Sequence, residues 1–199
     1  METTVQLNVQ ELLTGYLLKE DNIPCDDATK ELIAGLRRDH IAKPVIFIGS
    51  GSCGTIAGAG KVKEAVENYL HEREVNADII ETGCMGICSN EPVMDIQLPG
   101  RTRLSFSKVD PEEVTPILDD IFHTVLPPAT LAGQYAHSMQ SRWQHVPFMQ
   151  ELPFLKIQQR NVLENCGIID PGSIEEYIAR GGYKAYIRAI RYYSFEEVC

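Results

Sequence analysis

The 199-residue chain is poor in basic residues and has no long hydrophobic run. Its 18 Lys and Arg stand against 28 Asp and Glu, giving a formal charge of −10. This balance argues against a nucleic acid partner, because phosphate binding needs a basic face. No apolar run approaches the roughly 20 residues that a membrane span requires. Six cysteines are too few for a disulfide scaffold in a chain of this size, so we expect a cytoplasmic protein in a reducing compartment.

Three of the cysteines lie in two glycine-rich segments. Cys53 comes shortly after the apolar run at residues 45–48, and Cys84 and Cys88 come after the run at residues 77–80. Glycine allows the backbone to approach sulfur or metal closely. Thiolates gathered in this way are typical ligands of an iron–sulfur cluster, so we predict that Cys53, Cys84 and Cys88 converge and bind one. Zinc is a lesser alternative, because the Cys84–Cys88 spacing is wider than usual for zinc and neither loop contains a histidine.

Residues 44–125 predict a compact α/β domain. Strands are expected at residues 45–48, 77–81, 93–98 and 104–106, with one amphipathic helix after Gly60 and another that begins at Asp110. The order β-α-β-β-β-α is a thioredoxin-like layout, in which a parallel pair of strands is followed by an antiparallel hairpin. A right-handed crossover would place both cysteine loops at the same edge of the sheet.

The flanking segments are predicted to be simpler. Residues 1–43 form a helical lead-in, in which Asp26 or Asp27 caps a helix. Residues 126–152 are expected to be a loose linker with solvated polar groups. The residues of interest in that linker are His137, Arg142, Trp143 and His145. Residues 153–199 are expected to be helical and to form an incomplete domain, because a third helix announced by Ser194 and Glu197 has only one turn of chain left.

A resemblance to a known family rests on these segments. The sequences GSCGTIAGA at 51–59 and ETGCMGIC at 81–88 resemble the thioredoxin-like [2Fe–2S] ferredoxin domain. That domain opens the flavoprotein, NADH-oxidising subunits of bacterial hydrogenases and complex I-like dehydrogenases. The sequence PFLKIQQRNVLENCGIIDP at 153–171, with IEEY at 174–177 and GGY at 181–183, resembles the opening of their flavin domain.

The resemblance implies a function in electron transfer. In such subunits electrons pass among NADH, FMN and iron–sulfur centres, within a complex of several redox subunits. The family's glycine-rich loop for FMN and NADH is absent from this sequence, so FMN and NAD belong to the longer family members. This chain alone is therefore not expected to oxidise NADH.

The sequence departs from the family at one cluster ligand. Ferredoxins of this class usually carry a fourth cysteine five residues before the one that matches Cys53, and this chain has Ile48 there. A fourth ligand is then left to Ser50, Ser52, Cys25 or a residue of a partner subunit, while Cys166 is expected to be a packed residue. The alternative function is a cluster-free thioredoxin-like adaptor that docks partner subunits. The sequence is compatible both with a monomer and with a homo-oligomer.

Overall fold

The computed structural model describes residues 9–19, 23–127 and 130–199. It divides the chain into two compact units, one formed by residues 41–170 and the other by residues 1–40 together with 171–199. This division differs from the predicted boundaries, because residues 126–170 belong to the same unit as the sheet. No helix within the described ranges is long and apolar enough to cross a membrane.

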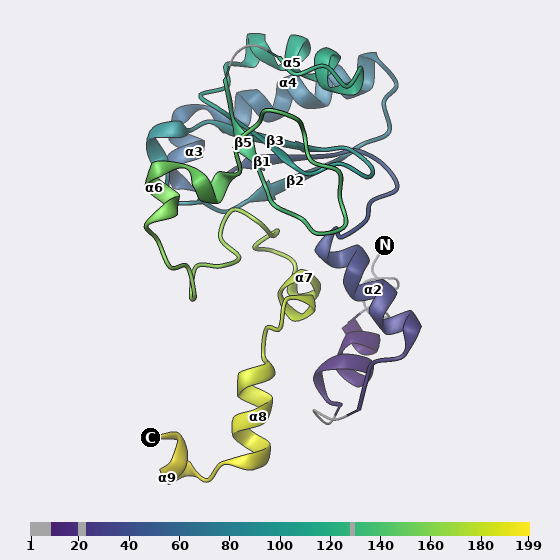
Figure 1. The fold of residues 1–199 in the computed structure, drawn as a ribbon, viewed down its shortest axis with the longest axis vertical. Helices are drawn as coiled ribbons and strands as arrows, with labels where there is room; N and C mark the ends of the chain where they lie inside the picture. The colour runs from purple at the N-terminus through teal and green to yellow at the C-terminus, as the bar shows by residue number, and fades with distance from the viewer. Residues whose placement is uncertain (1–8, 20–22, 128–129) are drawn as a thin grey trace. The chain divides into compact units, whose positions relative to one another are not determined.

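A five-stranded sheet forms the centre of the unit at residues 41–170 (Figure 1). Its strands are β1 (Val45–Gly49), β2 (Asp78–Thr82), β3 (Val93–Gln97), β4 (Leu104–Ser107) and β5 (Leu131–Gln134), in the spatial order β2-β1-β3-β4-β5. β1 is parallel to β2 and antiparallel to β3, and β3 and β4 are antiparallel neighbours. The α/β class and the parallel pair followed by an antiparallel hairpin are therefore confirmed.

One face of the sheet packs against helices α4 (Ala59–Glu72) and α5 (Val114–Phe122), and together they form the main core. Alternate strand residues such as Ile46, Ile48 and Ile96 are buried there, as the period of two in a strand requires. The 3-10 turn η3 (Pro111–Glu113) precedes α5. The backbone N–H of Asp110 donates to Glu113 Oε2 at 3.0 Å, which confirms the predicted capping of this helix.

The predicted linker at residues 126–152 is wrong, because much of this segment is bound to the sheet. It contributes β5 and the 3-10 turn η4 (Met149–Glu151), which precedes helix α6 (Pro153–Lys156). Trp143, expected in a solvated segment, is buried, and its Nε1 donates to the carbonyl of Thr102 at 3.0 Å. The buried Gln134 side chain accepts from Thr102 Oγ1 and Trp143 N and donates to the carbonyls of Trp143 and Val146.

The second unit is built from short helices around its own apolar cluster. It contains the π-helical turn η1 (Leu13–Leu17), α2 (Asp27–Arg37) and α7 (Ile174–Ala179). As predicted, Asp26 caps α2, where its carboxylate accepts from the backbone N–H of Thr29 at 2.8 Å. The cluster that these elements bury consists of Leu12, Leu17, Ile33, Ile178 and Ala179. The arginine at the end of each helix binds the other helix: Arg37 Nε donates to the carbonyl of Ala179 at 2.7 Å, and Arg180 Nη2 donates to that of Arg37 at 3.2 Å.

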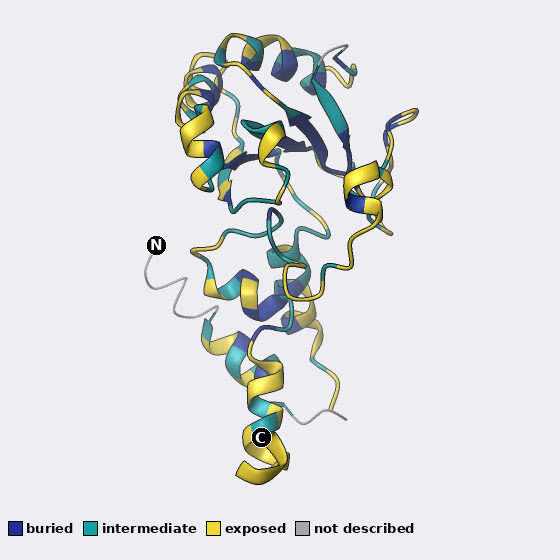
Figure 2. Ribbon diagram, turned by 90° about the vertical axis from the view of Figure 1, so that its left-hand side faces the viewer, coloured by how far each residue is buried: buried dark blue, intermediate teal, exposed yellow. Residues whose placement is uncertain are grey.

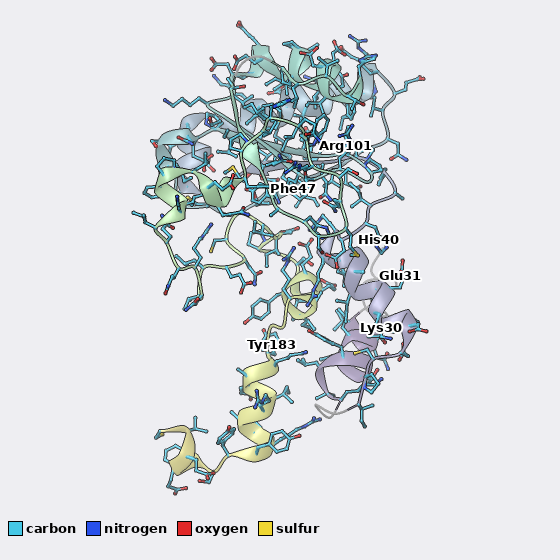
Figure 3. The ribbon with its side chains drawn as sticks, viewed as in Figure 1. Lys30, Glu31, His40, Phe47, Arg101 and Tyr183 are labelled. Atoms are coloured by element: carbon cyan, nitrogen blue, oxygen red, sulfur yellow. The ribbon has the colours of Figure 1, made fainter. Side chains whose placement is uncertain are left out.

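The last helices, α8 (Lys184–Tyr192) and α9 (Phe195–Val198), contain no buried residue (Figure 2). Tyr183, labelled in Figure 3, precedes α8 in a left-handed conformation. The predicted capping box of α9 is present, because Ser194 N donates to Glu197 Oε2 at 2.7 Å. Helix α7 begins at Ile174, after the capping residue Ser173, whose side chain accepts from the backbone N–H of Glu176.

Candidate metal centre

The two cysteine segments leave the sheet at the same edge, as predicted. Gly49, the last residue of β1, is paired with Thr82, the last residue of β2. One residue further on, Ser50 N donates to the carbonyl of Thr82 at 2.9 Å, so the segments that follow β1 and β2 stay side by side beyond the strands. At Gly51 they touch, because a Cβ added there would lie 2.9 Å from Cys84 Cβ. Only glycine fits at this approach without a shift of one chain.

Cys84 and Cys88 form a close pair of thiols. Their Sγ atoms lie 3.9 Å apart on the loop after β2, where Gly86 has a φ of +96°. Two sulfurs that each lie about 2.3 Å from one tetrahedral metal are separated by about 3.8 Å. The pair therefore already has the spacing of two thiolate ligands on one metal ion. Cys88 is exposed and Cys84 half-buried, so the site is open to solvent.

Local groups act in opposite directions on the Cys84 thiol. The backbone N–H of Gly86 donates to Cys84 Sγ at 3.2 Å and lowers the pKa of the thiol, because it stabilises the thiolate. Burial, the neighbouring Cys88 and the carboxylate of Glu91 act against this, and the net effect raises the pKa of Cys84. A bound cation would reverse the balance, because it favours the thiolate directly.

Cys53 is not placed as predicted. It was expected in a glycine-rich loop, but it is the second residue of helix α3 (Ser52–Ala57), which begins directly after β1 and is absent from the predicted elements. Within the described ranges, no group of three or more His, Cys, Asp or Glu side chains is arranged to hold a metal ion. The structure thus pairs Cys84 with Cys88 and leaves Cys53 on the adjoining segment, two residues beyond the Gly51 contact.

The other candidate ligands differ in burial and in the unit to which they belong. Ile48 is a fully buried strand residue, and Ser50 Oγ is 3.5 Å from the carbonyl of Ile48. Ser52 is exposed at the start of α3. Cys25 belongs to the unit formed by residues 1–40 and 171–199. Cys166 is half-buried, and its carbonyl accepts from Arg160.

A buried ion pair lies on the sheet face opposite α4 and α5. Arg103 binds Asp95 Oδ2 through Nε at 2.8 Å and Nη2 at 2.5 Å, and both side chains are almost completely buried. Its guanidinium stacks 3.6 Å from the ring centroid of Phe47, a residue labelled in Figure 3. It also donates to the carbonyls of Gly167 at 2.9 Å and Ile168 at 3.2 Å. One arginine thus neutralises a carboxylate and anchors residues 167–168 to the sheet.

Residues 167–168, which Arg103 anchors, pack against the Cys84–Cys88 loop. A Cβ at Gly167 would lie 3.0 Å from Met85 Cβ, and the Tyr135 hydroxyl lies 3.9 Å from Met85 Sδ. Burial, together with the charge of Asp95, raises the pKa of Tyr135 well above its usual range. Burial likewise raises the pKa of Glu91, against a hydrogen bond from Val93 N that lowers it. This support was not predicted from the sequence, although a carboxylate such as Asp95 within an apolar strand indicates a buried partner.

No protein-family model matches the chain. Among solved structures, it is similar to a thioredoxin-like [2Fe–2S] ferredoxin from Aquifex aeolicus, with 17% identity and a TM-score of 0.40 over 48% of this chain and 96% of that one. The wild-type form of the Aquifex protein in another crystal structure gives 19% identity and a TM-score of 0.38 over 48% of this chain and 99% of that one. Both similarities cover only about half of this chain.

Proposed function

We propose that residues 41–170 form an iron–sulfur electron-transfer module in which Cys84 and Cys88 bind one iron. The 3.9 Å separation of their sulfur atoms carries this proposal, because it is the spacing that one tetrahedral metal requires. The loop geometry adds support. The N–H of Gly86 points at Cys84 Sγ, as hydrogen-bond donors to cluster sulfurs do when they tune a reduction potential.

The finer proposal is a [2Fe–2S] cluster with Cys53 as a third ligand. The contact between Gly51 and Cys84 supports it, since it brings the segment that carries Cys53 against the thiol pair. The fourth ligand is not assigned, because Ile48 occupies the position at which the resembled family has cysteine. When bound, such a cluster supplies one-electron transfer. The chain itself positions the thiolates. The backbone N–H of Gly86 stabilises the charge on Cys84, and the contact between Met85 and Gly167 supports the loop.

The proposed setting is a redox complex of the NADH dehydrogenase or hydrogenase type. It is supported by the resemblance of residues 153–183 to the opening of a flavin domain in those flavoprotein subunits. The partners are then the other subunits of the complex. FMN and NAD are proposed only for the longer members of the resembled family.

Anaerobic reconstitution tests the module. The purified chain is incubated with ferrous iron and sulfide, desalted, and examined by iron, sulfide and zinc analysis, visible absorption and electron paramagnetic resonance after reduction. We expect the wild-type chain to bind iron and sulfide in equal molar amounts and to show a visible charge-transfer band. Cys84→Ser and Cys88→Ser should lose the bound iron and sulfide and the band. Cys199→Ser, at the exposed end of α9, is the matched control and should retain them.

Cys53→Ser tests whether Cys53 is a third ligand in addition to Cys84 and Cys88. If Cys53 is a ligand, this variant changes the resonance signal or loses the cluster. Iron uptake that is equal in Cys84→Ser and Cys199→Ser, or zinc bound in place of iron, would overturn the iron–sulfur function.

A cluster-free adaptor is the second candidate. The observation that favours it is the lack of any three-ligand group in the described part of the chain. An adaptor of this kind would dock partner subunits through the sheet-and-helix unit and use its thiols for packing alone. It predicts a colourless protein after reconstitution, and Cys84→Ser and Cys88→Ser variants that bind partner subunits as well as the wild type does.

A further inference from the structure

The thiols of Cys84 and Cys88 are close enough for a second chemistry when no metal is bound to them. Their Sγ atoms lie 3.9 Å apart, whereas the two sulfurs of a disulfide bond lie about 2.05 Å apart. Rotation of a cysteine side chain from one staggered position to the next moves its sulfur by about 3 Å, more than the gap of roughly 1.9 Å that must be closed. A side-chain movement is therefore of the size that bond formation requires.

The backbone on both sides of the pair is held in place. Met85, next to Cys84, packs against Gly167, where an added Cβ would lie 3.0 Å from Met85 Cβ. Cys88 begins the 3-10 turn η2 (Cys88–Asn90), in which Asn90 N donates to the carbonyl of Ile87 at 2.9 Å. The two thiols are thus presented to each other by a supported loop, and a group captured by one sulfur stays within reach of the other.

The two thiols differ in exposure, which gives them different roles. Cys88 is exposed, so an oxidant in solution reaches it directly. Cys84 is half-buried, and its Sγ accepts a hydrogen bond from Gly86 N at 3.2 Å. Thiol–disulfide exchange passes through a mixed disulfide, which a second thiol then resolves. Cys88 is therefore placed to react first, and Cys84 is placed to resolve the product.

We propose that Cys84 and Cys88 are a modification site, at which a small-molecule disulfide oxidises the metal-free pair to an intramolecular disulfide. In the first step the Cys88 sulfur attacks one sulfur of the oxidant. A bond forms between these two sulfurs, the S–S bond of the oxidant breaks, and its other half leaves as a thiol with the proton from Cys88. In the second step the Cys84 sulfur attacks Cys88 Sγ, and the remaining half leaves as a thiol with the proton from Cys84. The pair loses two electrons and two protons, and the oxidant gains them.

The disulfide and a bound metal would use the same two sulfur atoms, so each excludes the other. Oxidation of the pair therefore closes the metal site, and reduction opens it again. Exposed disulfides have more oxidising potentials and are readily reduced, which makes the change reversible. The oxidation is a property of the metal-free chain and does not depend on the iron–sulfur function.

The test uses the full chain, reduced and freed of metal by a chelator, with glutathione disulfide as the oxidant. Samples are quenched with acid and alkylated at intervals, and intact mass and peptide mapping show which thiols have reacted. We expect the wild-type chain to form a link between Cys84 and Cys88, with the loss of two hydrogen atoms and no glutathione retained on either residue. Cys84→Ser should instead keep one glutathione on Cys88, because the resolving thiol is missing.

Two further variants complete the test. Cys88→Ser removes the exposed thiol, so the reaction at Cys84 should slow by about tenfold or more. Cys199→Ser removes an exposed thiol beyond α9 and is the matched control, which should form the Cys84–Cys88 link at the wild-type rate. Circular dichroism confirms that each variant is folded.

Three results would overturn the proposal. They are a stable glutathione adduct on Cys88 of the wild-type chain, a link from Cys53 to either thiol in place of the Cys84–Cys88 link, and a Cys84–Cys88 link that forms only in denaturant. A chain that forms this disulfide but takes up no iron after reduction supports the modification site and contradicts the proposed function alone, so the two failures are distinguishable.

Discussion

Replacing Gly51 with alanine should damage the contact that joins the two cysteine segments. The added Cβ would lie 2.9 Å from Cys84 Cβ and 3.1 Å from Cys84 N, whereas carbon atoms in contact are normally about 3.5–4.0 Å apart. Cys84 N is backbone, and the chain before it is held by the bond from Ser50 N to the carbonyl of Thr82, so relief requires the loop to move. Overpacking of this kind costs about 1–3 kcal/mol. At ~2–4 °C per kcal/mol, the midpoint of thermal unfolding should fall by roughly 2–12 °C.

The assay is thermal unfolding of the metal-free protein followed by circular dichroism, so that the outcome is independent of any cluster. Gly60→Ala in α4 is the matched control, because a Cβ there meets no atom within 4 Å. Alanine is the better helix former by up to about 1 kcal/mol, so this control should unfold at the wild-type temperature or above it. A Gly51→Ala variant that unfolds together with the control would refute the close approach of the two segments.

Two further predictions concern buried polar groups. Arg103→Met leaves the Asp95 carboxylate buried without its partner, so the free energy of unfolding in urea should fall by about 3–5 kcal/mol; a loss below about 1 kcal/mol would contradict the buried pair. Burial and a hydrogen bond to Asp119 raise the pKa of Tyr69 to about 12 from its ordinary value of 10.0. Because the folded state keeps this proton longer than the unfolded chain does, stability should decline as the pH rises from about 10 to about 12. Tyr69→Phe should flatten that decline, and identical declines in the two proteins would disprove the shift.

Four of the five strands could be predicted because their signals are local, whereas β5 was not expected. The apolar run of β1, the alternating apolar residues of β3 and the capping pair Asp110 and Glu113 are each contained within a few residues. The shared edge of the two cysteine segments followed from the parallel pair of strands alone. The close pairing of Cys84 and Cys88 was likewise within reach, because one short loop carries both.

What could not be predicted depends on contacts between distant residues. Helix α3 was missed because it has only six residues and is flanked by Gly51 and Gly58, and the turn at Gly58 hid the boundary between α3 and α4. The error placed Cys53 in a loop and so made its convergence with the other thiols look simple. The linker was misread for a similar reason, since Trp143 is buried by residues some 40 positions away, such as Thr102.

The Gln134 side chain has a consequence for how this protein tolerates change. Its amide makes four hydrogen bonds, to Thr102, Trp143 and Val146, at a position that is almost completely buried. The irregular chain after β5 is held by this amide group together with backbone bonds such as those that join Ser141 to Gly100 and Thr102. Glutamate has the same shape but no donors, and leucine has neither donors nor acceptors. Substitution of this one residue would therefore remove support from several separate positions of the segment at once.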